Sequence, residues 1–244
     1  MNSILEEIYQ TGKLVDLRGV ERQVTGGVPR DHARILQEVA RLAQAHTTLE
    51  TGVAFGLSTL AICEVLQETG ADDVHHYGID PDQLAVHGGA AIASLRRAGL
   101  DHLFELCEGP SHLMLPRLLE KNVTLDFAFI DGWRTFDYTL LDFLYIDKML
   151  RPGGFLVLHD YNWPSKRKVA GYILTHRKYR VFPVREIPGP SPRRRLKGLL
   201  LAFRYWLQGT PSELTFSSLA YLPKIACFRK VENFEPNYDF FRNF

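Results

Sequence analysis

The chain contains 244 residues, of which 45% are hydrophobic and 23% are charged. Such a composition is ordinary for a folded globular protein and argues against disorder along the whole chain. The length suits one well-buried domain with an appendage and is too short for two full domains of usual size. No apolar run approaches the roughly 18 to 20 residues of a membrane-spanning helix. The first ten residues lack the basic region followed by an apolar region that a secretory signal has. We therefore expect neither a membrane-spanning helix nor a secretory signal.

The three cysteines, Cys63, Cys107 and Cys227, all fall within apolar patterns. A free thiol in such a pattern behaves as a small hydrophobe. Three scattered cysteines form neither a disulfide framework nor a metal-binding knuckle. They fit a reducing compartment best, so we expect a cytoplasmic protein.

The net charge of +1 hides a division along the chain. Residues 165–244 contain 16 Lys and Arg against 5 Asp and Glu, whereas residues 1–164 contain 13 against 23. Twelve of the basic residues lie between Lys166 and Arg204, together with the single acid Glu186. This block is either a solvated face or a surface that recruits an anionic substrate, a carrier protein or a membrane surface. It lacks the interleaved aromatic residues that stack on bases, so no nucleic-acid partner is expected.

The first segment, residues 1–29, shows a short helical pattern and then a Gly-Gly-Val-Pro turn. This segment comes before the apolar patterns that predict the hydrophobic core, and we interpret it as an N-terminal arm or lid. The main domain, residues 30–244, alternates helices and strands. Its predicted helices are 30–43, 57–68, 83–98, 111–120, 137–150 and 165–176, and its predicted strands are 47–51, 74–79, 103–107, 124–130, 154–159, 179–184 and 224–231. This alternation predicts a parallel sheet with right-handed crossovers and helices on both faces.

An insert at residues 185–223 interrupts the pattern before the last strand and begins with the proline-rich IPGPSP. Six apolar residues follow at helical spacing: Leu196, Leu199, Leu200, Phe203, Trp206 and Leu207. Four cations stand at the N-terminal end of this helix, where they oppose the helix dipole, so helix stability does not explain them. The insert is either a helix packed on the core or on a second subunit, a lid over the substrate, or a helix that contacts a membrane surface.

Residues 48–62, TLETGVAFGLSTLAI, read as a strand that turns at glycines into a helix. Gly52 and Gly56 lack side chains, which lets backbone amides approach a ligand, and the helix offers its N-terminal N–H groups. Asp80 ends a second apolar run, 24 positions after Gly56, where a carboxylate can bind both hydroxyls of a ribose. The spacing differs from the Gly-x-Gly-x-x-Gly turn of nicotinamide dehydrogenases, and the sequence contains no GxxxxGK[ST] phosphate loop.

This arrangement resembles the class I S-adenosylmethionine (SAM)-dependent methyltransferases over about residues 45–185. Further matches follow in the family's order: FELCEGP at 104–110, LDFAFIDG at 125–132 and MLRPGGFLVLHD at 149–160. The resemblance implies a doubly wound, mostly parallel sheet of seven strands, in which the last strand inserts antiparallel. It also implies SAM as the cofactor and assigns cofactor contacts to Glu50, Gly52, Phe55, Gly56, Ser58, Asp80, Glu108, Gly109 and Asp131.

Catalytic residues are expected beyond the carboxyl ends of the strands, where open α/β sheets bind ligands. Asp131, Arg134, His159 and Asp160 occupy such ends. Methyl transfer requires an acceptor held in line with the methyl group and, for a hydroxyl, its deprotonation. His159 titrates near neutrality and is the first candidate base. Arg134 stays protonated, so it can only anchor an anionic oxygen.

The same segment resembles two branches of the family. In one branch of small-molecule O-methyltransferases, a histidine stands at the position of Arg134 and the fifth strand ends in His-Asp. In the catechol-type enzymes, an Asp-x-Trp-Lys run supplies a metal ligand and a catalytic lysine, and residues 131–134 are its counterpart here. This second resemblance leaves open a divalent metal such as Mg²⁺ between Asp131 and Asp160. Tyr161 stands where the catechol-type pattern has an asparagine.

The resemblance as a whole implies methyl transfer from SAM to a hydroxyl, or less readily an amine or carboxylate, of a small molecule. Two alternatives stay open. One is another sulfonium reaction, such as a cyclisation or transfer of the aminobutyrate carbon, and the other is a SAM-binding regulatory subunit without catalysis. Nucleic-acid methylation is not expected, because IDGWR replaces the Asn-Pro-Pro-Tyr or Asp-Pro-Pro-Tyr motif after the fourth strand. A homo-oligomer is also left open.

Overall fold

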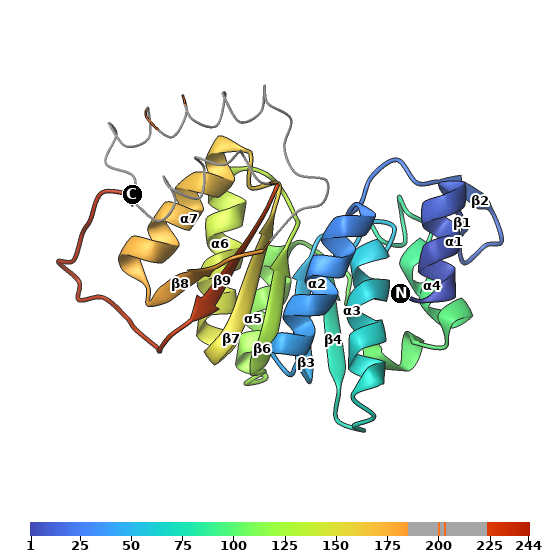
Figure 1. Cartoon of the computed structure of the whole chain (residues 1–244), viewed down its shortest axis with the longest axis horizontal. Helices are drawn as coiled ribbons and strands as arrows, with labels where there is room; N and C mark the ends of the chain where they lie inside the picture. Colours follow the sequence, from blue (N-terminus) through green and yellow to red (C-terminus); the bar gives the residue numbers. More distant parts are fainter. Residues whose placement is uncertain (185–199, 201–202, 204–223) are drawn as a thin grey trace.

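The computed structural model describes residues 1–184, 200, 203 and 224–244. Its centre is a seven-stranded sheet in the order β5-β4-β3-β6-β7-β9-β8 (Figure 1). The strands are β3 (Thr47–Thr51), β4 (His75–Ile79), β5 (Phe104–Cys107), β6 (Leu125–Ile130), β7 (Leu150–His159), β8 (Tyr179–Phe182) and β9 (Ile225–Lys230). Only β9 runs against the others, since it pairs antiparallel with both β7 and β8. The predicted doubly wound sheet with an antiparallel last strand is confirmed.

Helices cover both faces of this sheet and enclose two cores. The first core contains residues of α1 (Ser3–Thr11), α2 (Arg30–Leu42), α3 (Leu57–Glu68) and α4 (Ala90–Ala98), and the second contains residues of α5 (Ser111–Glu120), α6 (Phe136–Met149) and α7 (Pro164–His176). Successive side chains of a strand point to opposite faces. Accordingly, Phe127 and Phe129 of β6 join the first core, whereas Ala128 and Ile130 join the second. Both faces are therefore buried, which explains the near-continuous apolar runs of the strands.

The strand order reverses at β3, which lies between β4 on one side and β6 on the other. Open α/β sheets bind ligands at such a switch point, beyond the carboxyl ends of the strands. The turn after Thr51, the loop that begins at Asp80 and the loop that begins at Asp131 all meet at this edge, since Gly52 N donates to Ile79 O and Asp131 N donates to Thr51 O, both at 2.9 Å.

Residues 1–29 pack onto the main domain. Leu5 and Ile8 of α1 belong to the first core. Strands β1 (Lys13–Val15) and β2 (Glu21–Gln23) form an antiparallel hairpin that the sequence analysis did not predict. The backbone N–H of Leu17, in the hairpin turn, donates to the Gly88 carbonyl at 3.1 Å and ties the hairpin to the loop after β4. The role of this segment as a lid stays a prediction.

The helix predicted at 83–98 is wrong for its first seven residues, because α4 begins at Ala90 and residues 83–89 form turns. Gly88 and Gly89 have φ values of +64° and +72°, which lie in the left-handed region that an α-helix cannot include. The buried side chain of Gln83 donates to the Ala54 carbonyl at 2.7 Å and accepts from Ala91 N–H at 3.3 Å. Gln83 therefore anchors a loop instead of starting a helix.

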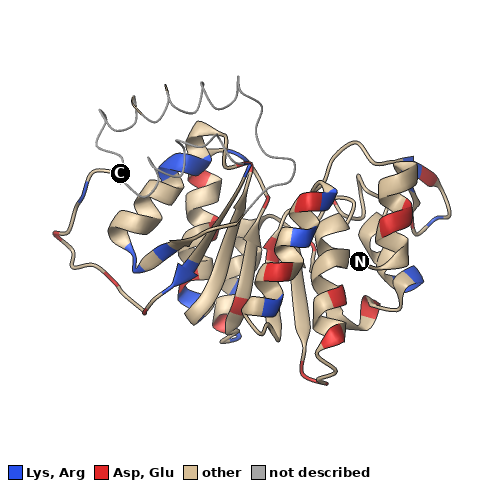
Figure 2. Ribbon diagram, in the orientation of Figure 1, with Lys and Arg blue, Asp and Glu red and all other residues tan. Residues whose placement is uncertain are grey.

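The predicted insert, 185–223, lies outside the described residues except for 200 and 203, so the roles considered for it stay predictions. At the end of the chain, Phe244 packs against Tyr172 and His176 of α7. Within the described ranges, no helix is long and apolar enough to cross a membrane. Figure 2 shows that charged residues lie mainly on helices and loops while most of the sheet is uncharged, as burial of both faces requires.

Candidate active site

A glycine turn connects β3 to α3 at the carboxyl edge of the sheet. Gly52 has a φ of +87°, in the region that favours glycine. A Cβ atom at this position would lie 2.6 Å from the Asp131 carbonyl oxygen. Gly56 has a φ of +79°, and a Cβ there would lie 2.5 Å from the Cβ of Ala91. The turn therefore needs both glycines, the first to approach the segment after β6 and the second to pack α3 on α4.

Asp80 follows β4 and organises the same turn. Its Oδ2 accepts hydrogen bonds from the N–H groups of Val53 at 3.0 Å and Ala54 at 2.8 Å. Its Oδ1 accepts from Asp82 N–H at 2.8 Å. An ionised carboxylate offers about four acceptor positions, so these three bonds leave about one for a ligand.

A cleft of about 760 Å³ opens at this edge of the sheet. Its volume lies within the ~300–1,000 Å³ typical of small-molecule sites. The ends of β3, β4 and β6 and the starts of α5, α6 and α7 all contribute to its wall. Four of the residues predicted for the site line it: Gly52, Asp80, Asp131 and Arg134.

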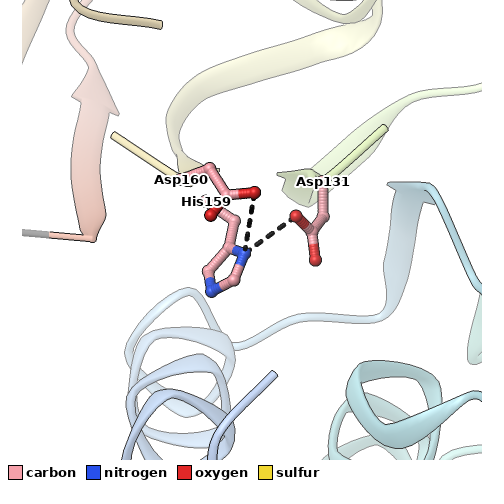
Figure 3. Close-up of side chains that lie close together, drawn as sticks. All are labelled: Asp131, His159 and Asp160. Carbon is pink, nitrogen blue, oxygen red and sulfur yellow. Dashed lines mark hydrogen bonds and ion pairs between the residues drawn. The ribbon is translucent and has the colours of Figure 1, made fainter. Parts of the chain in front are cut away.

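A cluster of three polar side chains, Asp131, His159 and Asp160, lies at the ends of β6 and β7 (Figure 3). One potential ligand atom from each residue lies within 4.8 Å of the others. His159 Nδ1 is 2.8 Å from Asp131 Oδ1 and 4.0 Å from Asp160 Oδ2. Asp160 has a φ of +52°, which is uncommon for a residue other than glycine and often marks a functional site. The structure thus brings together residues that the sequence placed at the ends of two different strands.

His159 also contacts His32, at the start of α2, which the sequence analysis missed. His32 Nδ1 lies 2.9 Å from His159 Nε2, and both side chains are buried. Because an ionised carboxylate can only accept, His159 donates its Nδ1 proton to Asp131. In the neutral ring, Nε2 of His159 then accepts a hydrogen bond from the Nδ1–H group of His32. Both nitrogens of His159 are therefore engaged, and a buried chain of contacts runs from α2 to the cleft.

Arg134 lies at the mouth of the cleft, with 56% of its side chain exposed. Its Nε donates to Asp160 Oδ2, and its guanidinium carbon lies 5.7 Å from the centre of the Trp163 ring. Ser165 Oγ donates to the Arg134 carbonyl and ties this loop to the start of α7. Arg134 therefore neutralises Asp160 from the solvent side.

Glu50 points away from the cleft toward α3 and is fully buried. Its Oε1 accepts from the hydroxyl of Thr59 and lies 3.1 Å from His76 Nε2. His76 Nδ1 in turn lies 2.8 Å from Thr48 Oγ1. Glu50 thus belongs to a buried polar network under the glycine turn, and its predicted contact with the cofactor stays a prediction.

The other predicted cofactor residues surround the cleft without belonging to its lining. Phe55 packs edge-on against His87, with ring centres 5.0 Å apart. Ser58 is buried in the first turn of α3. Glu108 Oε1 accepts from Leu84 N–H at 3.2 Å. A Cβ at Gly109 would lie 2.9 Å from Met114 Cε, so this position follows β5 in close contact with α5.

Two buried charged residues were also missed: Asp142 of α6, which lines the cleft, and Lys166 of α7, which does not. Asp142 Oδ2 accepts from the Thr51 hydroxyl at 2.9 Å. Burial raises the pKa of Asp142, against the hydrogen bonds of Ser111 and Thr51 and the charge of Lys166, which lower it. An acid inside a helix and a lysine in a basic run are typical of solvated helix faces, so no sequence signal distinguished them.

A protein-family model described as a methyltransferase domain matches residues 49–161. This range contains the glycine turn, Asp80 and the three-residue cluster. Over this segment the chain is similar to the class I SAM-dependent methyltransferases. This likeness agrees with the joint occurrence of the sheet, the glycine turn and the acid after β4, as the resemblance implied.

Two curated relatives are methyltransferases by name, one of them an O-methyltransferase. It is 27% identical to tapetum-specific methyltransferase 1 of Arabidopsis thaliana, over 62% of this chain and 64% of that protein. It is 31% identical to a catechol O-methyltransferase of Niastella koreensis, over 53% of this chain and 56% of that protein. The matched region thus spans less than two thirds of either methyltransferase.

Among solved structures, the O-methyltransferase TomG of Streptomyces achromogenes, in complex with SAM, superposes with a TM-score of 0.65. The two chains are 16% identical, and the match covers 95% of this chain and 91% of TomG. At this identity the likeness shows the fold alone. It agrees with the methyltransferase sheet described above.

Proposed function

We propose that the chain transfers the methyl group of SAM to an oxygen atom of a small molecule. The observation that carries this proposal is the contact between the glycine turn and the polar cluster. Gly52 lies against the backbone of Asp131, and both residues line one cleft. A cofactor at the turn would therefore lie next to side chains that can hold an acceptor oxygen, which is the positioning that methyl transfer requires.

The residues at the carboxyl edge fit SAM as the cofactor. The one remaining acceptor position of Asp80 suits a ribose hydroxyl, and the close approach at Gly52 leaves the β3 end free of side-chain obstruction. The lining residues Pro110 and Ser111, after β5, suit the adenine side. SAM brings a methyl group that its sulfonium already activates, so the protein must bind, orient and deprotonate the acceptor.

In the cluster of Asp131, His159 and Asp160, the two carboxylates fit a divalent cation such as Mg²⁺ or Mn²⁺. His159 could add an imidazole nitrogen, which suits Fe²⁺ or Zn²⁺ better than Mg²⁺, only when Nδ1 loses its proton and the hydrogen bond to Asp131 is given up. The mutual separation of at most 4.8 Å suits ligands of one ion. When bound, such a cation would lower the pKa of an acceptor hydroxyl and stabilise the resulting oxyanion.

Among the side chains of this site, Asp131 is the residue that we assign to accept the hydroxyl proton. It lines the cleft, and His159 holds it through one carboxylate oxygen at 2.8 Å. His159 is fixed on its other side by His32, so its role here is to orient Asp131. Arg134, which cannot act as a base, is placed to anchor an anionic oxygen of the acceptor at the mouth of the cleft.

An aromatic wall at the mouth supports a planar acceptor such as a catechol or another phenol. Trp133 and Tyr138 stack with ring centres 5.9 Å apart and interplanar angle 29°, and both line the cleft. Trp133 is 66% exposed and Trp163 is 47% exposed. Large exposed aromatic side chains beside a cleft favour stacking on a ring. The catechol O-methyltransferase relative agrees with this class of acceptor.

The experiment is an incubation of the purified chain with SAM and a panel of catechols, hydroxycinnamates and flavonoids, followed by mass spectrometry. Methyl transfer produces S-adenosylhomocysteine and an acceptor heavier by one methylene unit. Release of methylthioadenosine would instead establish transfer of the aminobutyrate carbon. Binding of SAM without its consumption, across the panel and with Mg²⁺ or Mn²⁺ supplied, would refute the proposed reaction in favour of a regulatory subunit.

A further inference from the structure

Lys166 is a buried lysine for which the proposed reaction has no use. It lies in the first turn of α7, and none of its surface is exposed. Its Nζ has no hydrogen-bond partner among the residues that the structure describes. An ammonium group withdrawn from water without a partner is costly. A lysine at this position therefore requires a compensating charge nearby.

Three carboxylates provide that charge from different elements: Asp131 after β6, Asp142 in α6 and Asp160 after β7. Burial has the largest effect on Lys166 and lowers its pKa. Asp131, Asp142 and Asp160, in this order, raise the pKa, and the charge of Arg134 lowers it. The charges of all three acids thus act on one buried ammonium group.

The acids differ in their other partners. Asp160 pairs with Arg134 at the exposed mouth of the cleft. In the described part of the chain, neither Asp131 nor Asp142 forms an ion pair with an arginine or a lysine within 4.0 Å; Asp131 contacts His159, and Asp142 is bonded to Thr51 and Ser111. Lys166 is a fully buried lysine whose charge interacts with both carboxylates.

We propose that Lys166 is the internal counter-ion of the active site. From its buried position in α7, its ammonium group compensates Asp131 and Asp142, and it competes with a divalent cation for Asp131, the one carboxylate that this pair shares with the proposed cation site. Lys166 does not line the cleft, so it acts on the acceptor only through Asp131 and is a positioning residue. The competition rests on the cation site proposed above, whereas the compensation of Asp131 and Asp142 does not.

The compensation is tested without metal, by urea unfolding at pH 7 in the presence of a chelator. Lys166→Met is expected to lower the urea midpoint, because it leaves buried carboxylates without their cation. Adding Asp142→Asn to Lys166→Met is expected to recover at least half of that loss, because removing both members of a buried charge pair costs less than removing one. Lys121→Met is the matched control, since this exposed lysine pairs at 3.6 Å with Glu105 of the edge strand β5 and neither residue lines the cleft.

The competition is tested by titrating the same variants with Mn²⁺ and measuring free Mn²⁺ by electron paramagnetic resonance, without SAM or acceptor. Lys166→Met is expected to bind Mn²⁺ at least about tenfold more tightly than the wild type. A factor of ten corresponds to only about 1.4 kcal/mol, and a unit charge several ångströms from a divalent ion exceeds this value at an effective dielectric constant of about 20. Lys121→Met is expected to bind Mn²⁺ as the wild type does.

These outcomes separate the two ideas. Additive losses of Lys166→Met and Asp142→Asn in urea would overturn the counter-ion assignment. Non-additive losses with no Mn²⁺ binding by any variant would refute the cation site and the competition while supporting the compensation. Equal or weaker Mn²⁺ binding by folded Lys166→Met, with binding by the wild type, would refute the competition alone. If Lys166→Met fails to fold, the proposal requires that Asp142→Asn in the same chain restores folding, and failure of both chains would overturn it.

Discussion

Gly52 links the proposed cofactor turn to the polar cluster, and its replacement by alanine measures how tightly the two are joined. The φ of +87° puts an alanine in the left-handed region, at a cost of about 1–2 kcal/mol. The added Cβ would also lie 2.6 Å from the Asp131 carbonyl oxygen and 2.9 Å from Gly132 N. Overpacking against surroundings that cannot yield costs about 1–3 kcal/mol more. The variant is therefore expected to lose about 2–5 kcal/mol of unfolding free energy.

The chain contains a matched control for this change. Gly19 in the hairpin turn has a φ of +78°, close to that of Gly52, but a Cβ there would meet nothing within 4 Å. Gly19→Ala is expected to lose only the backbone term, about 1–2 kcal/mol. Urea unfolding of both variants separates the two contributions, because the difference between them reports the contact of residue 52 with the Asp131 segment.

The same two variants test the proposed function. If the contact positions Asp131 beside the cofactor, Gly52→Ala is expected to weaken SAM binding in calorimetry and to slow turnover, whereas Gly19→Ala leaves both unchanged. Equal losses of stability in the two variants would refute the steric argument. Wild-type SAM affinity and turnover in a folded Gly52→Ala protein would refute the role of this turn in the site.

Three further outcomes are expected. Asp80→Ala weakens SAM binding at least about tenfold, since a hydrogen bond to a charged group contributes about 1.5–3 kcal/mol; unchanged affinity in calorimetry would remove Asp80 from the cofactor site. Asp131→Asn reduces turnover by about a hundredfold or more, because general base catalysis usually accelerates a reaction by at least this factor, and it leaves the SAM affinity near that of the wild type. Full activity of this variant would show that another group accepts the proton of the acceptor hydroxyl. Burial, followed by the charge of Arg177, lowers the pKa of His176 below its ordinary value of 6.5. The stability that neutral His176 provides is therefore complete above about pH 6.5 and is lost as the pH falls through its lower folded-state pKa. His176→Gln should flatten the fall in unfolding free energy between pH 7 and pH 5, and a slope equal to that of the wild type would contradict this assignment.

The elements that the sequence predicted well are those whose signals are local. The strand, glycine turn and helix at 48–62 carry a periodic apolar pattern broken at glycines, and β3 and α3 occur within one residue of the predicted bounds. The loop at 83–89 was predicted as a helix because the hydrogen bonds of Gln83 to Ala54 and Ala91, which hold the loop, leave no local sequence pattern. The hairpin at 13–23 was missed, although Asp16 and Gly19 are residues typical of a turn.

The site was predictable where strand ends define it and unpredictable where helices complete it. The rule that ligands bind at the carboxyl ends of parallel strands selected Asp131 and Asp160 without any structure. His32, Asp142 and Lys166 reach the site from α2, α6 and α7. Each lies in a helix whose pattern does not reveal which polar side chain is turned inward. Only the packing of helices on both faces of the sheet shows that these groups converge.

The distribution of cations explains how a site with an arginine at position 134 can serve a reaction for which the catechol-type pattern has a lysine. Arg134 remains charged and half exposed, so it can pair with Asp160 and face an anionic acceptor, but it cannot take a proton. The buried positive charge comes instead from Lys166, which does not line the cleft. Asp131 contacts His159 and interacts electrostatically with Lys166, so its ability to accept a proton depends on both. In the proposed reaction, substitutions in α2 or α7 therefore affect the deprotonation of the acceptor through Asp131.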